Sequence, residues 1–323
     1  MYPETRLRRL RKTKGMRDLV CETRLSPENL VLPVFFDENL DRPRATESMP
    51  DVPTWALKDY EEIAGGIEGS GVSSVLVFGI PKRKDAAGSQ AYAENGVVQK
   101  AVRGLKDGSD LLVIADLCMC EYTDHGHCGI LCRDGRVDND GTVELYGRIA
   151  VSQARAGADI ISPSGMMDGQ IAAIRAALDD AGFEDTPIMA YSAKYQSAYY
   201  GPFRDIANSA PDKGDRAGYQ MAPSNRREAL REIAADIEEG ADIVMVKPAG
   251  PYLDIVREAA DTFPYPLCAY QVSGEYAMIK AAAANGWIDE NRVMEESLLG
   301  IKRAGADIIV TYYAEKMARM LRE

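Results

Sequence analysis

The segment DLCMCEYTDHGHCG, residues 116–129, holds the side chains best suited to chemistry in this chain. It contains three of the six cysteines and both histidines. Thiolates are soft ligands that bind zinc and related metals. A structural zinc site uses four protein ligands, whereas a catalytic zinc site leaves one position open. Cys118, Cys120 and Cys128 are three, so they predict a metal ion that can contact a substrate.

The cysteines could instead form disulfides or stay as plain buried thiols. Six cysteines in 323 residues are few for a disulfide scaffold, which is usually short and cysteine-rich. The basic N-terminus is not followed by the apolar stretch of a secretory signal, so we expect a cytoplasmic protein with reduced thiols. His125 and His127 could bind the metal, support its ligands or line the loop. Because three thiolates are available, we favour a supporting or substrate-facing role for them.

The charge of the chain excludes some partners. A formal net charge of -12 argues against nucleic-acid binding, which needs a basic footprint. No apolar run reaches the roughly 18 residues of a spanning helix, so we expect a soluble protein without membrane contact. The basic cluster at residues 6–14 is a local exception. We expect a solvated face or mobile arm there, and less often a contact with a partner subunit.

Short β-branched runs alternate with amphipathic, helix-length segments along the chain. The runs are continuously apolar, which is typical of parallel strands buried on both faces. We predict eight strands, at 30–36, 72–80, 111–117, 158–162, 187–192, 241–247, 266–272 and 306–312. The clearest helical segments are 142–156, 169–181, 226–239 and 291–304.

A near-repeat supports this count of strands. GADII at 157, GADIV at 240 and GADII at 305 each end a predicted helix with glycine and begin a strand. Eight such units predict an α/β protein with a (β/α)₈ TIM barrel fold. An open doubly wound sheet is the alternative, but no glycine-rich phosphate motif follows the first strand.

In a (β/α)₈ barrel the active site lies where the strands end. Polar side chains gather at six consecutive predicted strand ends. They include Asp116, Ser164, Lys194, Lys247, Ser273 and Tyr312.

The two lysines point to carbonyl chemistry. Each ends an apolar strand, where the alternative is a lysine that extends to solvent at the barrel rim. Neighbouring strands lie roughly 4.8 Å apart, so the amines of Lys194 and Lys247 would be close together. Keeping both protonated in apolar surroundings would cost free energy. The pKa of one must fall, and a neutral lysine amine attacks ketones to form a Schiff base.

Residues 195–223 form a long connection after Lys194. A connection of this length in a compact domain is usually a lid or a disordered insert. It carries Arg204, Arg216 and Gln220, and arginines beside a Schiff-base lysine suggest a clamp for a substrate carboxylate. The segment could instead be a solvated surface loop.

Together these motifs resemble the porphobilinogen synthase family, also called 5-aminolevulinate dehydratases, in its zinc-cysteine form. The resemblance covers nearly the whole chain. The motifs that carry it are DLCMCEYTDHGHCG (116–129), SPSGMMDG (162–169), YSAKY (191–195), GPFR (201–204), KGDRAGYQM (213–221), MVKPAGPYLD (245–254), YQVSGEYAM (270–278) and IKRAGAD (301–307).

The resemblance implies a hydro-lyase of tetrapyrrole (haem) biosynthesis that condenses two molecules of 5-aminolevulinate into porphobilinogen and releases two waters. It implies that Lys247 forms a Schiff base with the first-bound substrate and that Lys194 binds the ketone of the second. It implies a catalytic zinc on the three cysteines. By the same resemblance, Ser273 and Tyr312 hold the first substrate's carboxylate.

The resemblance also implies roles for the remaining residues. Arg204, Arg216 and Gln220 would surround the second substrate, and Asp116 and Ser164 would lie near its amino end.

The same resemblance implies an assembly. Glu232 would bind an allosteric magnesium between subunits, with Arg11 near that contact. The family assembles as an octamer through N-terminal arms, here residues 1–25, ahead of a single catalytic barrel, residues 26–323.

Two rival functions remain open from the residues alone. A Schiff-base aldolase on the same barrel needs one essential lysine and no thiolate cluster. A metal-binding scaffold needs a fourth zinc ligand and no paired lysines at strand ends.

Overall fold

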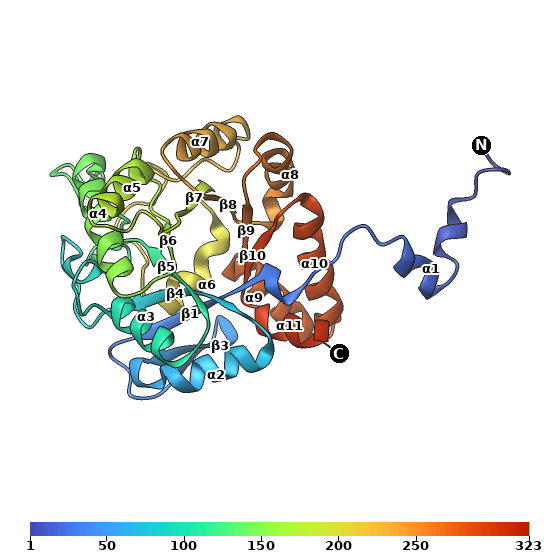
Figure 1. Ribbon diagram of the computed structural model, residues 1–323, viewed down its shortest axis with the longest axis horizontal. Coiled ribbons are helices and arrows are strands. Elements are labelled where there is room, and N and C mark those ends of the chain that lie inside the picture. Colours follow the sequence, from blue (N-terminus) through green and yellow to red (C-terminus); the bar gives the residue numbers. More distant parts are fainter. Residues whose placement is uncertain (323) are drawn as a thin grey trace.

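Eight parallel strands close into a barrel with helices around the outside, as Figure 1 shows for this computed structural model, which describes residues 1–322. The predicted (β/α)₈ fold is confirmed. The strands are β1 (Leu30–Asp37), β4 (Ser74–Ile80), β5 (Leu112–Leu117), β6 (Ile160–Pro163), β7 (Met189–Lys194), β8 (Ile243–Lys247), β9 (Leu267–Gln271) and β10 (Ile308–Thr311). Their order around the sheet is β6-β5-β4-β1-β10-β9-β8-β7. A bridge between Ile161 and Ile188 closes β6 onto β7.

The GAD repeat sets the register of three strand pairs. Its glycines, Gly157, Gly240 and Gly305, have φ of 98°, 106° and 122°, a left-handed region that favours glycine and ends each helix. The aspartate of each GAD sequence makes two hydrogen bonds to the neighbouring strand, as a paired strand residue would. Its N–H donates to a carbonyl of the neighbouring strand, and its carboxylate accepts from a backbone N–H there. The pairs are Asp159 with Val113, Asp242 with Ile188 and Asp307 with Leu267. The regular strands therefore begin after the aspartate, two residues later than predicted.

Amphipathic helices cover the barrel. All four clearest predicted helices are present, as α4 (Asn139–Arg155), α5 (Gln170–Asp180), α7 (Arg227–Glu238) and α10 (Glu290–Ala304). The others around the barrel are α2 (Tyr60–Ser70), α3 (Val97–Gly108), α8 (Leu253–Thr262), α9 (Ser273–Ala284) and α11 (Ala314–Arg322). None of the helices within residues 1–322 has the length and apolar character needed to cross a bilayer.

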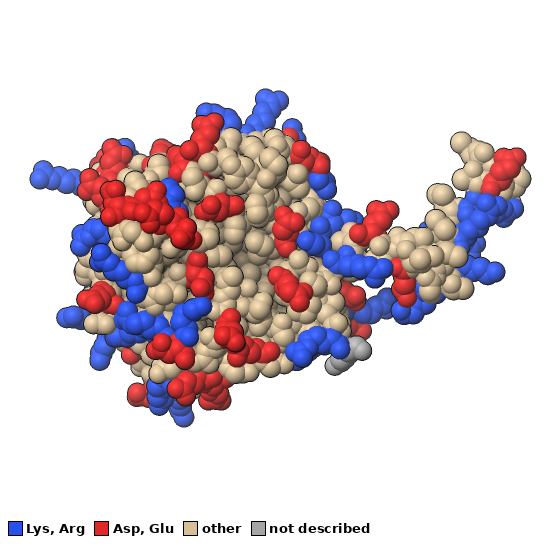
Figure 2. Space-filling view, viewed as in Figure 1, with Lys and Arg blue, Asp and Glu red and all other residues tan. Residues whose placement is uncertain are grey.

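The N-terminal arm extends away from the barrel (Figure 1). It contains a 3₁₀ turn (Leu7–Arg11) and α1 (Lys14–Leu19), neither of which has a buried residue. Lys and Arg side chains run along it (Figure 2). Its apolar side chains are exposed too, with Leu7 74% and Leu19 78% accessible.

Two further features were not predicted from the sequence. A hairpin of β2 (Arg44–Thr46) and β3 (Met49–Ala56) follows β1, and Pro50 and Pro53 within β3 hide its strand pattern. Residues 195–223 contain a 3₁₀ turn (Ala198–Tyr200) and helix α6 (Gly201–Ala207).

Alanine substitutions at two helix glycines distinguish the effect of helix propensity on stability from the effect of side-chain packing. A Cβ at Gly104 of α3 would lie 2.6 Å from the ring of Tyr60, whereas a Cβ at Gly65 of α2 would meet nothing within 4 Å. We expect Gly65→Ala to stabilise the protein by about 0.5–1 kcal/mol through helix propensity. We expect Gly104→Ala to destabilise it, because overpacking costs about 1–3 kcal/mol. Thermal or urea unfolding of both variants measures this, and equal stability would contradict the packing of α3 on α2.

Candidate active site

The carboxyl ends of the strands surround a small cavity of about 20 Å³. Side chains from β5, β7 and β8, from segments after β6, β9 and β10, and from residues 195–223 line it. Nine of the predicted site residues lie on its wall: Asp116, Cys120, Ser164, Lys194, Arg204, Arg216, Lys247, Ser273 and Tyr312.

The two lysines lie opposite each other on paired strands. The register between β7 and β8 matches Lys194 with Lys247, after an irregularity between Ala190 and Ala193. Lys194 is 5% and Lys247 6% exposed, so neither extends to solvent. The alternative of two lysines that reach solvent at the rim is therefore wrong.

The amine of Lys247 is surrounded by aromatic rings. Its Nζ lies 3.9 Å from the ring centre of Tyr270, 4.9 Å from Tyr191 and 5.4 Å from Phe203. Within residues 1–322 this amine makes no hydrogen bond or ion pair. Ring faces attract a cation, but here they replace water. Burial, and then the charge of Lys194, lower the pKa of Lys247 to about 7. A large neutral fraction at neutral pH makes this amine a nucleophile.

Lys194 belongs to a polar group with Ser164 and Asp116. Its Nζ donates to the carbonyl of Ser164 at 2.5 Å, and the hydroxyl of Ser164 donates to Oδ2 of Asp116 at 3.2 Å. Burial, and then the nearby Glu121, raise the pKa of Asp116 to about 7. Among the residues that the structure describes, none bonds to the buried Oδ1 atom of Asp116, so this atom can accept or give a proton at a bound molecule.

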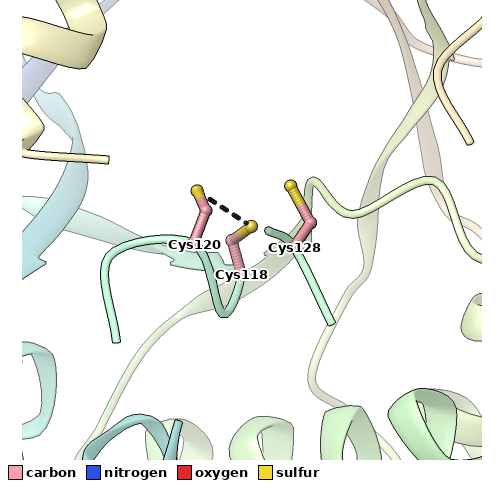
Figure 3. A group of neighbouring side chains, drawn as sticks. All are labelled: Cys118, Cys120 and Cys128. Carbon is pink, nitrogen blue, oxygen red and sulfur yellow. Dashed lines mark hydrogen bonds between the residues drawn. The ribbon is translucent and has the colours of Figure 1, made fainter. Parts of the chain in front are cut away.

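The three cysteines form a compact thiol group, in which Figure 3 shows the sulfurs on the same side of the loop. Their Sγ atoms lie within 4.8 Å of one another, with Cys118 and Cys120 at 3.4 Å. Hydrogen bonds from Cys118 and Cys120, and the charge of Arg216, hold the pKa of Cys128 well below its usual value. A thiolate is therefore stabilised here, as a soft cation requires.

The thiol group fits a metal with an open position. All three cysteines are buried, and no fourth His, Cys, Asp or Glu joins them in the part of the chain that the structure describes. Cys120 also lines the cavity, so a bound ion would border it.

The histidines lie beside this group without joining it. His127 contacts the hydroxyl of Tyr219 through Nδ1 at 3.2 Å and the carbonyl of Lys213 through Nε2 at 3.0 Å. It thereby ties the cysteine loop to residues 195–223. Nδ1 of His125 accepts from the N–H of His127 at 3.2 Å. Neither ring is on the cavity wall, and the contacts of His127 are those of a supporting residue.

Residues 195–223 bring two guanidinium groups to the cavity. Arg216 donates to the carbonyls of Gly126 at 3.0 Å and Ser209 at 2.7 Å, which anchors this segment to the cysteine loop. The Nε atoms of Arg204 and Arg216 are buried and have no hydrogen-bond partner within residues 1–322. Burial, and then the charge of Arg216, lower the pKa of Arg204. Two cations with free donors form a site for an anion such as a carboxylate.

Three further predicted residues are Ser273 and Tyr312, which line the cavity, and Gln220, which does not. Ser273 Oγ accepts from the N–H of Phe203 at 3.0 Å, and the hydroxyls of Tyr312 and Tyr270 lie 3.2 Å apart. Gln220 is buried with both amide atoms unpartnered, but it lines a neighbouring pocket instead of the main cavity.

Glu232 is on the wall of that neighbouring pocket, with Asp168 and Glu228. Burial, and then Asp168, raise its pKa. Within residues 1–322 it belongs to no close group of three metal-ligating side chains.

Sequence reasoning missed several residues of the cavity wall. Glu121 is buried beside Cys120, and the rings of Tyr200, Phe203 and Tyr270 surround the amine of Lys247. Glu121 lies within the cysteine-rich segment and Phe203 directly precedes Arg204, but neither position by itself indicates a cavity wall. Tyr270 lies within an apolar strand, where core packing explains it equally well.

Comparisons with known proteins identify the family of this chain. The family model described as delta-aminolevulinic acid dehydratase matches residues 4–320. Proteins of that name from Bacillus subtilis and Archaeoglobus fulgidus are each 53% identical, over 98% and 99% of this chain and the same shares of their own. The crystal structure of delta-aminolevulinic acid dehydratase (porphobilinogen synthase) from Toxoplasma gondii, in complex with its reaction product porphobilinogen, superposes with a TM-score of 0.95. It is 40% identical and covers 98% of this chain and 91% of its own. This chain belongs to the delta-aminolevulinic acid dehydratase family.

Proposed function

We propose that this protein is a hydro-lyase that condenses two molecules of 5-aminolevulinate into porphobilinogen, with loss of two waters, in tetrapyrrole (haem) biosynthesis. The observation that carries this proposal is the pairing of buried Lys194 and Lys247 at one cavity that also carries a thiol of the cysteine group. The porphobilinogen bound in the Toxoplasma gondii relative supports it.

Each lysine binds one of the two substrate molecules. The neutral amine of Lys247 attacks the ketone of the first 5-aminolevulinate, and loss of water leaves a Schiff base. Ser273 and Tyr312, on the same wall, hold the carboxylate of that molecule. Lys194 binds the ketone of the second molecule. The carbon–carbon and carbon–nitrogen bonds that join the two molecules then close the pyrrole ring. The amines of Lys247 and Lys194 leave the two former ketone carbons as the ring forms, and the two ketone oxygens depart as the two waters.

Groups near Lys194 and on residues 195–223 hold the second substrate. The free guanidinium donors of Arg204 and Arg216 bind its carboxylate, with Gln220 behind them. Asp116 and Ser164, linked by a hydrogen bond, accept its amino end and move protons during ring closure. Zinc, when held by Cys118, Cys120 and Cys128, would supply Lewis acidity beside this substrate.

The N-terminal arm and the pocket of Glu232 support an assembly of several copies. The exposed apolar side chains of the arm, such as Leu7 and Leu19, favour a homo-oligomer in which residues 1–25 pack on other subunits, as an octamer. Arg11 would contribute to that contact. The carboxylates near Glu232 support a magnesium site there, because magnesium prefers oxygen ligands. The six free cysteines fit a reducing cytoplasm as the compartment of the protein.

Borohydride reduction in the presence of 5-aminolevulinate tests the Schiff base. We expect substrate to become attached to Lys247, at a rate that rises about tenfold per pH unit up to the pKa of about 7 and levels off above it. Lys194→Met removes the neighbouring charge, so it should move the midpoint to higher pH. Peptide mass spectrometry measures the attachment, with Lys302→Met as a control. Absence of the adduct at Lys247 would refute the mechanism.

Removal of a thiol ligand tests the metal. Loss of a group that only supports a metal ligand costs about 10–100-fold, so Cys128→Ser should lose at least that much activity together with bound zinc. Cys21 is exposed, and Cys21→Ser is the matched control. Metal content per chain and turnover are measured together. Full turnover in protein verified to be free of zinc would disprove a catalytic metal.

A separate experiment addresses Glu232. We expect magnesium to shift the native protein toward its larger assembly in sedimentation velocity, and Glu232→Gln to abolish that shift while leaving bound zinc unchanged. Glu238→Gln, exposed on the same helix α7, should respond like the native protein. An unchanged response of Glu232→Gln would rule out a magnesium site at Glu232.

A further inference from the structure

One buried carboxylate outside the cavity connects the two loops that hold the first substrate. Glu275 occupies the first turn of α9 and is 7% exposed. Its Oε2 accepts from the N–H of Val272 at 2.8 Å, which caps the helix. Its Oε1 accepts from the N–H of Gly250 at 2.8 Å, in the loop after β8. The cap alone needs only one of these oxygens.

The two bonded segments carry groups that act on the same molecule. Gly250 lies three residues after Lys247, and Val272 immediately precedes Ser273. The loop after β8 is also held by the N–H of Ala249, which donates to the carbonyl of Tyr270 at 2.8 Å. Glu275 therefore fixes the backbone distance between the amine that attacks the ketone and a hydroxyl proposed to bind the carboxylate.

The surroundings of Glu275 favour its two hydrogen bonds to Val272 and Gly250. Within residues 1–322 no cation pairs with it, and burial raises its pKa to about 7, so its position costs stability that an apolar residue would not. Two backbone N–H groups and the N-terminus of α9 offset part of that cost. A Cβ at Gly250 would lie 2.4 Å from Oε1. The backbone of Gly250 is not in the left-handed region, so the carboxylate alone excludes a side chain there.

We infer that Glu275 is a positioning residue that sets the spacing between the Lys247 amine and the Ser273 hydroxyl for the first substrate. This inference rests on the proposed function. It assigns Glu275 no contact with substrate. Since a displacement of about 1 Å can cost about 10²-fold in rate, loss of either hydrogen bond should slow the first covalent step.

The test compares Glu275→Gln with Asp289→Ala. Asp289 caps the neighbouring helix α10 by accepting from the N–H of Arg292 at 3.0 Å, so its loss removes a helix cap of the same kind away from the cavity. The rate of borohydride trapping at Lys247 is measured at saturating 5-aminolevulinate, well below each melting temperature. We expect Glu275→Gln to lower that saturating rate at least tenfold, and Asp289→Ala to lower only the melting temperature.

A second variant covers the case in which Glu275→Gln does not fold. Gly250→Ala displaces Oε1 while leaving the cap on Val272 in place, and should lower the same saturating rate. A saturating rate within twofold of the native value in a folded Glu275→Gln or Gly250→Ala variant would overturn the positioning role. If native protein shows no trapping at Lys247, the proposed function fails, and the inference with it.

Discussion

The chemistry proposed for this protein depends on keeping the amine of Lys247 out of water beside a second lysine. Burial disfavours the charged form of an amine, and a neighbouring positive charge disfavours it further. Both effects act on Lys247, whose pKa they lower to about 7. A solvated lysine would be almost wholly protonated at that pH and could not attack a ketone. The remainder of the site keeps this costly arrangement in place.

The barrel provides the first part of that support. Pairing of β7 with β8 sets Lys194 against Lys247, and the GAD aspartates fix the register of three strand pairs, including this one. Aromatic rings from β7, β9 and α6 exclude water from the amine. Residues 195–223 cover the cavity and are tied to the cysteine loop by Arg216 and His127. The same segment thus contacts both the cysteine loop and the cavity, whose wall carries Cys120 and both lysines.

Much of this arrangement could be predicted from the sequence. The continuous apolar runs gave all eight barrel strands, because strands buried on both faces leave a pattern that needs no knowledge of tertiary contacts. Lysines at strand ends and clustered cysteines indicated the cavity because these patterns, too, are visible without knowledge of tertiary contacts. The hairpin β2–β3 was missed because its prolines hide the strand pattern. Helix α6 was missed because seven residues are too short for a helical period to be distinctive.

Long-range partners were beyond the reach of the sequence. The carboxylate of Glu275 reads locally as a helix cap, and its bond to Gly250 spans 25 residues. In the sequence, the tyrosines around Lys247 are indistinguishable from core residues. The separation of Gln220 from the main cavity wall depends on how residues 195–223 fold back. Such contacts follow from the closed barrel and leave no local pattern.

The pKa of Lys247 in the substrate-free protein is the most direct test of the proposed chemistry. Reductive methylation with formaldehyde is the measurement, because its rate at each lysine follows the neutral fraction of the amine. Lys280, whose pKa is raised by its contacts with Asp51 and Glu290, serves as the internal reference. We predict a midpoint for Lys247 near pH 7, far below that of Lys280. A midpoint near pH 10 for both lysines would contradict a neutral, nucleophilic amine at Lys247.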